Sequence, residues 1–315
     1  MFKTFKKILI TGCSGFCGYW LIKHIKERFP CSVLFGIDLI PNKNVNSVLD
    51  TFYSLNLSDF KKTREVIDKI KPEAVFHLAG IFNSENVEKI YEFNIGGTAN
   101  LLRAVDLIKS KHKITVLLTS SAAVYGNVDR KENLIVENHQ ICPISQYGIS
   151  KAAVEMLGRL YSKNPSMEVV ISRTFNLLGP GLSGNLLPGR IANEILTIKK
   201  RGMKENIIKI GNINATRDFL DVRDAVKRYV NLVLYGKANE IYNVGSGKGI
   251  KISELIKFFI EKSNLKISIV SNSKLYHNND INYSVADITK ISGIMKVKQE
   301  INTKQSISDM LEYDK

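Results

Sequence analysis

The architecture of this 315-residue chain can be inferred from the segment Lys7-Ile8-Leu9-Ile10-Thr11-Gly12-Cys13-Ser14-Gly15-Phe16-Cys17-Gly18. Its first five residues form an apolar, β-prone run, and a helical pattern follows the last glycine as far as Arg28. Gly12 and Gly15 permit a tight turn and a close approach of the backbone to a pyrophosphate, and Gly18 lets the helix pack on the strand. The helix start would present free N–H groups and a positive dipole end to the phosphates. The segment therefore predicts a dinucleotide-binding loop.

A second apolar run, residues 32–37, ends on Asp38, which lies 20 residues after Gly18. A carboxylate at this distance can accept hydrogen bonds from both ribose hydroxyls of an adenosine, whereas it would repel a 2′-phosphate. The sequence therefore predicts NAD rather than NADP. The alternative is a solvated loop aspartate, which the neighbouring glycine loop disfavours.

Strand and helix patterns alternate along the first half of the chain. Apolar runs predict strands at 51–55, 74–80, 115–120 and 168–172, and amphipathic patterns predict helices at 58–70, 87–108 and 150–161. This alternation predicts an α/β fold, a Rossmann-type doubly wound parallel sheet. The alternation becomes looser after Pro180, which indicates a smaller C-terminal substrate-binding lobe. We expect an NAD-binding domain at 1–174, which also receives residues from about 210–250, and a lobe at 175–315.

Composition and charge exclude several classes of protein. The chain is 44% hydrophobic, and its longest apolar runs are too short to span a bilayer. Its formal net charge is +15, but the lysines are scattered, which favours an anionic small ligand over nucleic acid. The N-terminus lacks the apolar core of a signal peptide. The cysteines have neither Cys-x-x-Cys nor zinc spacing, so we expect no metal site and reduced thiols in a cytoplasmic protein: Cys13, Cys17, Cys31 and Cys142.

Tyr147 and Lys151 stand four residues apart at the start of a predicted helix, so both side chains point from one face. A free tyrosine loses its proton near pH ~10, and a nearby ammonium or an oxidised nicotinamide would lower that pKa. The pair is therefore a candidate proton-transfer device. Ser121 follows a predicted strand at the end where such sheets bind ligands, and it could donate to a substrate oxygen. Each feature alone also fits an ordinary helix or turn, and His77 is better explained as a structural histidine than as a base.

Together these motifs resemble the extended short-chain dehydrogenase/reductases that act on nucleotide-sugars, the NAD-dependent epimerase/dehydratase family. The resemblance covers essentially the whole chain. It is carried by Thr-Gly-Cys-Ser-Gly-Phe-Cys-Gly (11–18), Phe-His-Leu-Ala-Gly (76–80), Asn-Ile-Gly-Gly-Thr (94–98), Ser-Ser-Ala-Ala-Val-Tyr-Gly (120–126), Tyr-Gly-Ile-Ser-Lys (147–151) and Arg-Asp-Phe-Leu-Asp-Val-Arg-Asp (217–224).

The resemblance implies a role for each matching residue. Tyr147 would exchange a proton with the sugar oxygen, Lys151 would hold the nicotinamide ribose and lower the pKa of the tyrosine, and Ser121 would hydrogen-bond the same oxygen. Besides Tyr147 and Lys151, the implied cofactor contacts are Gly12, Ser14, Gly15, Phe16, Cys17, Gly18, Asp38, Asn56, Leu57, Leu78, Ala79, Gly80, Asn94 and Thr119. The implied substrate contacts are Asn83, Ser121, Ala122, Asn176, Arg190, Arg217 and His277. Relatives more often have Asp at position 56 and an arginine near position 277.

Two reactions remain open within this family. Dehydrating relatives carry carboxylates directly after the catalytic Ser or Thr, whereas this chain has Ala122 and Ala123, so we do not expect a 4,6-dehydratase. The leading interpretation is an enzyme that reduces a 4-keto(-6-deoxy) hexose nucleotide with NADH, because the C-terminal half is most similar to GDP-6-deoxy-4-hexulose reductases. The alternative is a nucleotide-sugar 4-epimerase with tightly bound NAD, which the 120–126 loop resembles more. A non-catalytic NAD-binding regulator would usually lack Tyr147 or Lys151.

The family also implies an assembly and a cellular role. Two helices per subunit commonly form a four-helix contact, here residues 87–108 and 150–161. We therefore expect a homodimer, without membrane or nucleic-acid partners, that acts in polysaccharide biosynthesis.

Overall fold

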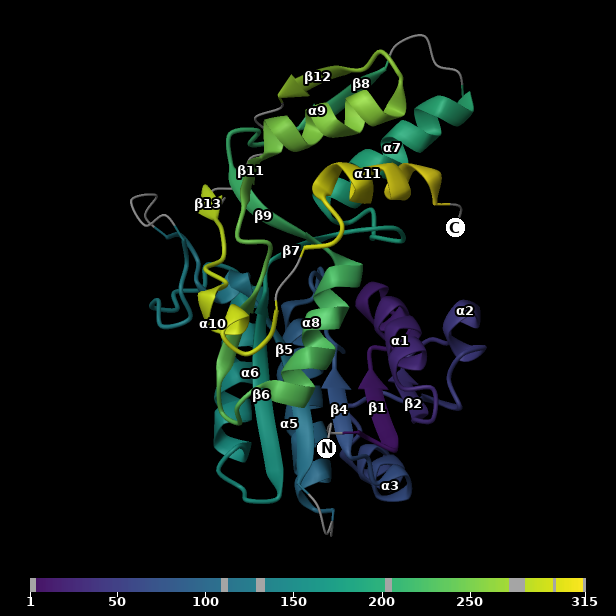
Figure 1. The fold of residues 1–315 in the computed structure, drawn as a ribbon, viewed down its shortest axis with the longest axis vertical. Coiled ribbons are helices and arrows are strands. Elements are labelled where there is room, and N and C mark those ends of the chain that lie inside the picture. The colour runs from purple at the N-terminus through teal and green to yellow at the C-terminus, as the bar shows by residue number, and fades with distance from the viewer. Residues whose placement is uncertain are drawn as a thin grey trace.

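The structure is a computed structural model that describes residues 4–108, 113–128, 134–201, 206–271, 281–296 and 299–313. Its centre is a parallel sheet of seven strands in the order β10-β6-β5-β4-β1-β2-β3 (Figure 1). The strands are β1 (Lys7–Thr11), β2 (Val33–Asp38), β3 (Thr51–Ser54), β4 (Ala74–His77), β5 (Ile114–Ser121), β6 (Met167–Thr174) and β10 (Ile241–Val244). The chain reverses its direction across the sheet beside β1, which opens a crevice at the carboxyl ends of β1 and β4. The expected α/β architecture is confirmed.

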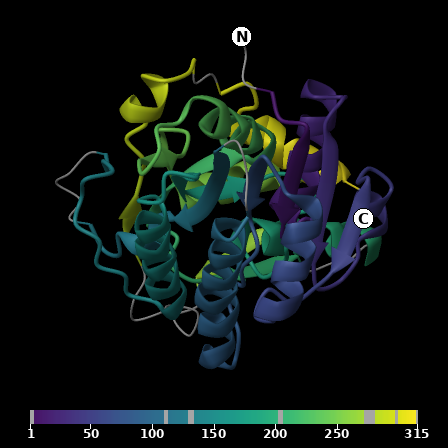
Figure 2. The ribbon, with the colours of Figure 1, turned by 90° about the horizontal axis from the view of Figure 1, so that it is seen from below.

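Helices cover both faces of this sheet (Figure 2). One face carries α1 (Phe16–Arg28) and α8 (Val222–Tyr235), and the other carries α3 (Phe60–Ile70), α5 (Gly97–Asp106) and α6 (Gln146–Tyr161). Alternate residues of strand β1 face opposite sides of the sheet. Ile8 and Ile10 belong to the core under α1 and α8, whereas Leu9 belongs to the core under α3 and α5. Burial on both faces explains the continuous apolar runs of the sequence.

The expected long helix at 87–108 is interrupted at its Asn-Ile-Gly-Gly-Thr segment. It comprises α4 (Val87–Tyr91), a π-helical turn (Glu92–Gly96) and α5. Asn94 lies in the π-helical turn; its Oδ1 accepts from the N–H of Ile81 at 2.8 Å, and its Nδ2 donates to Ser150 Oγ at 2.9 Å. Such turns often occur at functional sites, and this one connects the segment after β4 to α6.

The remaining elements form a smaller layer above the carboxyl ends of the large sheet (Figure 1). Strand β9 (Thr216–Asp221) pairs with β7 (Asn176–Leu178), β11 (Gly249–Lys251) and β13 (Tyr283–Ser284), while β8 (Ile207–Ile210) pairs with β12 (Ser268–Ser271). A separate core joins them to α7 (Leu187–Arg201), α9 (Ile252–Ser263) and α11 (Thr303–Glu312). Short elements complete the chain: α2 (Lys43–Asn46), the 3₁₀ turn Ala122–Val124 and α10 (Thr289–Ser292). Residues 210–250 are divided between the two layers. Helix α8 and strand β10 belong to the large sheet and its helices, whereas β9 and β11 belong to the small sheet. The domain boundary at 174 stays a prediction.

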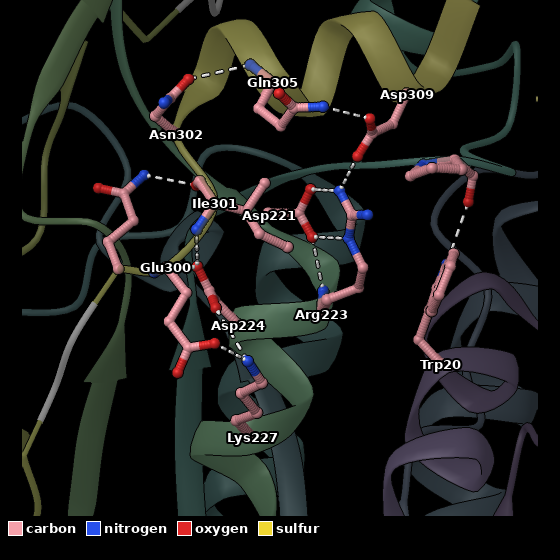
Figure 3. A network of polar contacts seen from close by, with 12 residues as sticks. Trp20, Asp221, Arg223, Asp224, Lys227, Glu300, Ile301, Asn302, Gln305 and Asp309 are labelled. Carbon is pink, nitrogen blue, oxygen red and sulfur yellow. Dashed lines mark hydrogen bonds and ion pairs between the residues drawn. The ribbon is translucent and has the colours of Figure 1, made fainter. Parts of the chain in front are cut away.

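A polar network joins α8 to the C-terminal segment (Figure 3). Arg223 donates through Nε and Nη2 to both carboxylate oxygens of Asp221 at 2.8 Å, and through Nη2 to Asp309 of α11 at 2.6 Å. Asp224 accepts from the backbone N–H groups of residues 300 and 301, each at 3.0 Å. These contacts attach the smaller layer to the helix that packs beside α1. Among the described residues, no helix combines the length and apolar character needed to cross a membrane.

Candidate active site

The glycine loop after β1 has no room for larger side chains at two positions. Gly12 has a φ of +69°, and a Cβ there would lie 2.6 Å from the backbone nitrogen of Ala79. A Cβ on Gly18 would lie 2.5 Å from the carbonyl oxygen of Cys13. Gly15 precedes α1 without a side-chain cap, so the first N–H groups of the helix remain available to a ligand. The loop therefore has the shape and the free donors of a phosphate site.

A cavity of about 690 Å³ opens beside this loop. Its walls include the expected cofactor residues Gly12, Ser14, Gly15, Asp38, Asn56, Leu57, Leu78, Ala79 and Gly80. Asp38 accepts from the N–H of Ser14 at 2.9 Å through Oδ2 and from the N–H of Leu39 at 2.7 Å through Oδ1. Lys43 also lines this cavity, and no motif of the sequence marked it. An apolar floor, a carboxylate and loop N–H groups together fit the adenosine half of a dinucleotide.

A second cavity, of about 730 Å³, lies between the large sheet and the smaller layer. It shares Leu78 and Gly80 with the first, so the two adjoin. Its walls include the expected residues Phe16, Cys17, Thr119, Ser121, Tyr147, Lys151, Asn176, Arg190 and Arg217. The described residues that line it include the cations Lys151, Arg190 and Arg217 and no carboxylate. This charge distribution suits an anionic ligand.

Helix α6 and strand β5 bring the expected catalytic residues together. Ser145 caps the helix by accepting from the N–H of Gly148 at 3.0 Å. Lys151 Nζ donates to the carbonyl oxygen of Thr119 at 2.8 Å and lies 5.7 Å from the centre of the Tyr147 ring. The Ser121 hydroxyl lies close enough to Tyr147 for side-chain hydrogen bonding to lower the pKa of the phenol. Ser121, Tyr147 and Lys151 thus form one wall of the larger cavity.

The electrostatics of this wall correct one expectation. The sequence led us to expect that Lys151 lowers the pKa of Tyr147. In the structure, burial of the phenol raises its pKa to about 12, and the hydrogen bond with Ser121 acts in the opposite direction. Burial also lowers the pKa of Lys151 to about 8. Desolvation is therefore the largest cause of the pKa shift for both groups.

Four expected site residues line neither cavity. Gly18 packs beneath the glycine loop, Asn94 is buried in the π-helical turn, and Ala122, which directly follows β5, is buried in a core cluster. Asn83 is exposed outside both cavities. The expected contact from His277 falls outside the described residues.

Phe82 is another cavity residue that sequence reasoning missed. It lines the larger cavity, and its ring meets that of Tyr147 edge-on with 5.0 Å between the centroids. It lies in the segment after β4, where no periodicity marks side-chain direction. Its neighbour Asn83 had been expected in that role.

Comparison with known proteins is consistent with this architecture. A family model described as GDP-mannose 4,6 dehydratase matches residues 9–310. The chain is 31% identical over 312 residues to GDP-6-deoxy-D-mannose reductase of Pseudomonas aeruginosa, covering 97% of this chain and 96% of that protein. It is 30% identical over 332 residues to UDP-glucose 4-epimerase of Mycoplasma genitalium, covering 96% and 94%. The solved structure of RMD from Pseudomonas aeruginosa complexed with NADPH has a TM-score of 0.84 at 27% identity and covers 98% of this chain and 96% of its own.

Proposed function

The chain belongs to the GDP-mannose 4,6-dehydratase family, and on this basis we propose that it is an NAD(H)-dependent reductase of a 4-keto(-6-deoxy) hexose nucleotide. One observation carries the proposal. Ser121, Tyr147 and Lys151 form one wall of a cationic cavity whose described lining residues include no carboxylate. Such a wall can exchange a proton with a sugar oxygen, and it lacks the groups that dehydration requires.

The protonation state of Tyr147 suits reduction. Burial raises its pKa to about 12, so the phenol carries its proton at neutral pH. A bound nicotinamide supplies the hydride that reaches the carbonyl carbon. Tyr147 Oη gives its proton to the oxygen of that carbonyl, and Ser121 Oγ hydrogen-bonds the same oxygen and orients it. Lys151, whose Nζ lies 5.7 Å from the centre of the Tyr147 ring, would hold the ribose next to the nicotinamide.

Dehydration is disfavoured although the family takes its description from a dehydratase. The positions after Ser121 hold Ala122 and Ala123, which cannot move protons. Ala122 is buried, and the N–H of Ala123 donates to Ser121 Oγ at 3.2 Å. The backbone of Ala123 thus holds the serine hydroxyl, and neither alanine side chain can exchange a proton.

The charged residues of the two cavities indicate which ligand group each would bind. We propose that the first cavity holds the adenosine of NAD, with the Asp38 carboxylate accepting from its ribose. Arg190 and Arg217 line the part of the larger cavity contributed by the smaller layer, and we propose that they bind the diphosphate of the sugar nucleotide. Asn176 lines the same cavity and donates to the carbonyl oxygen of Asp218 at 3.1 Å.

A 4-epimerase with tightly bound NAD is the second candidate. It is supported by the similarity to the Mycoplasma genitalium epimerase and by the Ser-Ala-Ala-Val-Tyr-Gly loop. Purified protein is first scanned by absorbance for retained cofactor, then supplied with a GDP-linked 4-keto-6-deoxy hexose with and without NADH. One NADH consumed per sugar reduced supports the reductase. Interconversion of two sugars without net use of NADH contradicts it.

Replacement of Tyr147 by phenylalanine tests the assigned acid. Tyr147→Phe removes one oxygen and leaves the ring contact with Phe82, so we expect NADH binding to persist. Turnover should fall by roughly 10²- to 10⁴-fold, the usual contribution of a positioned acid. Unchanged turnover would show that another group protonates the sugar.

We further propose that the protein is a cytoplasmic homodimer active in polysaccharide biosynthesis. Helices α5 and α6 lie side by side on the outer face of the sheet (Figure 2). Large apolar side chains are exposed there on α6, with Met156 63% and Leu160 60% exposed. Burial of such a stripe against a second copy would remove it from water. Light scattering should give a dimer mass, and Leu160→Glu should give a monomer.

A further inference from the structure

A buried carboxylate lies one helical turn beyond the catalytic lysine. Glu155 follows Lys151 by four residues on α6, as Lys151 follows Tyr147. Its Oε1 accepts a hydrogen bond from Ser120 Oγ at 2.6 Å. Three successive turns of α6 therefore contact the last three residues of β5, and the last of these is Ser121.

An arginine on the neighbouring strand completes this contact. Arg173 of β6 donates through Nε to Glu155 Oε1 at 2.9 Å and through Nη2 to Oε2 at 2.7 Å. Both side chains are only 3% exposed. Arg173 stands directly beside Ser120 in the register of β5 and β6. A forked, charge-assisted contact of this kind restricts rotation as well as distance.

The row of buried polar residues extends to the edge strand of the sheet. Asn243 of β10 is the register partner of Arg173, and its Oδ1 accepts from Tyr125 Oη at 2.7 Å. The guanidinium carbon of Arg173 lies 4.7 Å from the centre of the Tyr125 ring. Arg173 Nη1 also donates to the carbonyl oxygen of Glu137 at 2.8 Å. Ser120, Arg173 and Asn243 thus occupy neighbouring positions on β5, β6 and β10, one residue before Ser121 and the cavity wall that carries Tyr147.

A stabilising role alone explains this arrangement poorly. A buried ion pair recovers little more than its desolvation cost, and an apolar pair of the same volume often serves stability as well. The two-point contact between Glu155 and Arg173 differs from apolar packing because it fixes the orientation of α6 on β5 and β6. It also fixes which residue of α6 faces which residue of these strands. The first residue beyond that contact on β5 is the serine that hydrogen-bonds Tyr147.

We propose that Glu155 and Arg173 are positioning residues that act through Ser120 to hold Ser121 against Tyr147. The proposal rests on the proposed function, in which Ser121 and Tyr147 share the sugar oxygen. The hydrogen bond from Ser121 lowers the pKa of Tyr147, so loosening it should raise that pKa further. The consequence appears in sugar oxidation, where Tyr147 must first lose its proton.

Two variants test the proposal in the intact protein. Ser120→Ala removes one hydrogen bond and keeps the ion pair, and Glu155→Gln weakens the pair itself. We expect kcat to fall by roughly ten- to a hundred-fold, with little change in the Kd for NADH or the KM for the sugar nucleotide. The rate of sugar oxidation should increase with pH as Tyr147 loses its proton, and this increase should occur at higher pH in both variants than in the wild type. Glu155→Gln should also lower Tm, whereas Ser120→Ala should lower it little.

A matched control separates positioning from loss of stability. Ile67 belongs to α3, is fully buried and lines neither cavity, so Ile67→Val should lower Tm without moving the pH profile. If Ser120→Ala and Glu155→Gln keep the wild-type profile and kcat per folded molecule, the proposal is wrong.

A second readout does not require turnover. The ultraviolet difference between each protein and its Tyr147→Phe counterpart reports the titration of this phenol in the NAD complex. Ser120→Ala should shift that titration upward, whichever of the two reactions the protein catalyses. An unshifted titration overturns the positioning role, while a shift together with inactive wild-type protein overturns only the proposed function.

Discussion

Acidification is expected to destabilise the protein through His77, because its hydrogen bonds fit only the neutral ring. Its side chain is buried, with Nδ1 2.7 Å from Thr11 Oγ1 and Nε2 2.8 Å from Thr98 Oγ1. Thr98 gives its own proton to the carbonyl oxygen of Asn94 at 2.5 Å, so it can only accept from His77. Nε2 therefore carries the proton, and Nδ1 accepts from Thr11. A second proton would occupy that acceptor and remain unsolvated.

The size of the effect follows from the pKa. Burial lowers the pKa of His77 from 6.5 to about 3, so the unfolded chain takes up the proton first. The stabilising contribution is complete above pH 6.5 and is lost as the pH falls from 6.5 towards 3. By linkage, the free energy of unfolding drops by up to ~1.4 kcal/mol per pH unit, or about 2 kcal/mol between neutrality and pH 5.

Urea unfolding of the wild type and of His77→Gln between pH 8 and pH 5 measures how much His77 contributes to the pH dependence of the free energy of unfolding. Glutamine can donate to Thr98 and accept from Thr11, so the variant should fold, less stable at pH 8 but with a flatter pH dependence. Burial lowers the pKa of His24 as well, but that contribution is common to both proteins and cancels in their difference. Parallel stability curves between pH 7 and pH 5 would refute the reasoning.

Three further outcomes are expected at the cofactor site. The wild type should prefer NADH to NADPH in kcat/KM by at least about tenfold, because a carboxylate repels a 2′-phosphate, and Asp38→Asn should narrow that ratio. Binding of NADH, followed by fluorescence, should weaken above pH 8, because burial lowers the pKa of Lys151 to about 8; Lys151→Met should abolish that dependence. Gly12→Ala should abolish NADH binding and lower Tm, since its Cβ would lie 2.6 Å from Ala79 N at a φ of +69°; Gly96→Ala, with open space around its Cβ, is the control.

The dinucleotide half of the molecule could be predicted because its signals are local. Strand β1, the glycine loop and α1 are consecutive, and the alternation that follows them indicates a parallel sheet whichever strands are neighbours. The small sheet gave no such signal. Strand β7 has three residues and β13 has two, and both pair with β9 from far along the chain. Strands this short show no periodicity, and only tertiary packing forms them.

The site divides in the same way. Tyr147 and Lys151 belong to one helix, so their spacing places them together. Phe82 and Asn83 lie in a segment whose course depends on the hydrogen bonds between Asn94 and Ile81, and the sequence does not show which of the two side chains enters the cavity. Ala122 was expected on the cavity wall, but the chain turns into a 3₁₀ helix at that point and buries it.

The pKa of Tyr147 shows why the sequence could indicate the Tyr147–Lys151 pair but not the protonation state of its two members. Spacing says that an ammonium is near a phenol, and it does not say how much water either has lost. In the structure both groups are desolvated, which raises the pKa of Tyr147 to about 12 and lowers that of Lys151 to about 8. Both shifts favour neutral forms, so a phenol that already holds its proton faces the sugar. A ketone can be reduced from that state directly, whereas a hydroxyl can be oxidised only after the phenol has lost its proton, a step that the positive charge of an oxidised nicotinamide would assist. Desolvation of this wall thus favours the protonated phenol, which is the form that can deliver a proton to a sugar ketone.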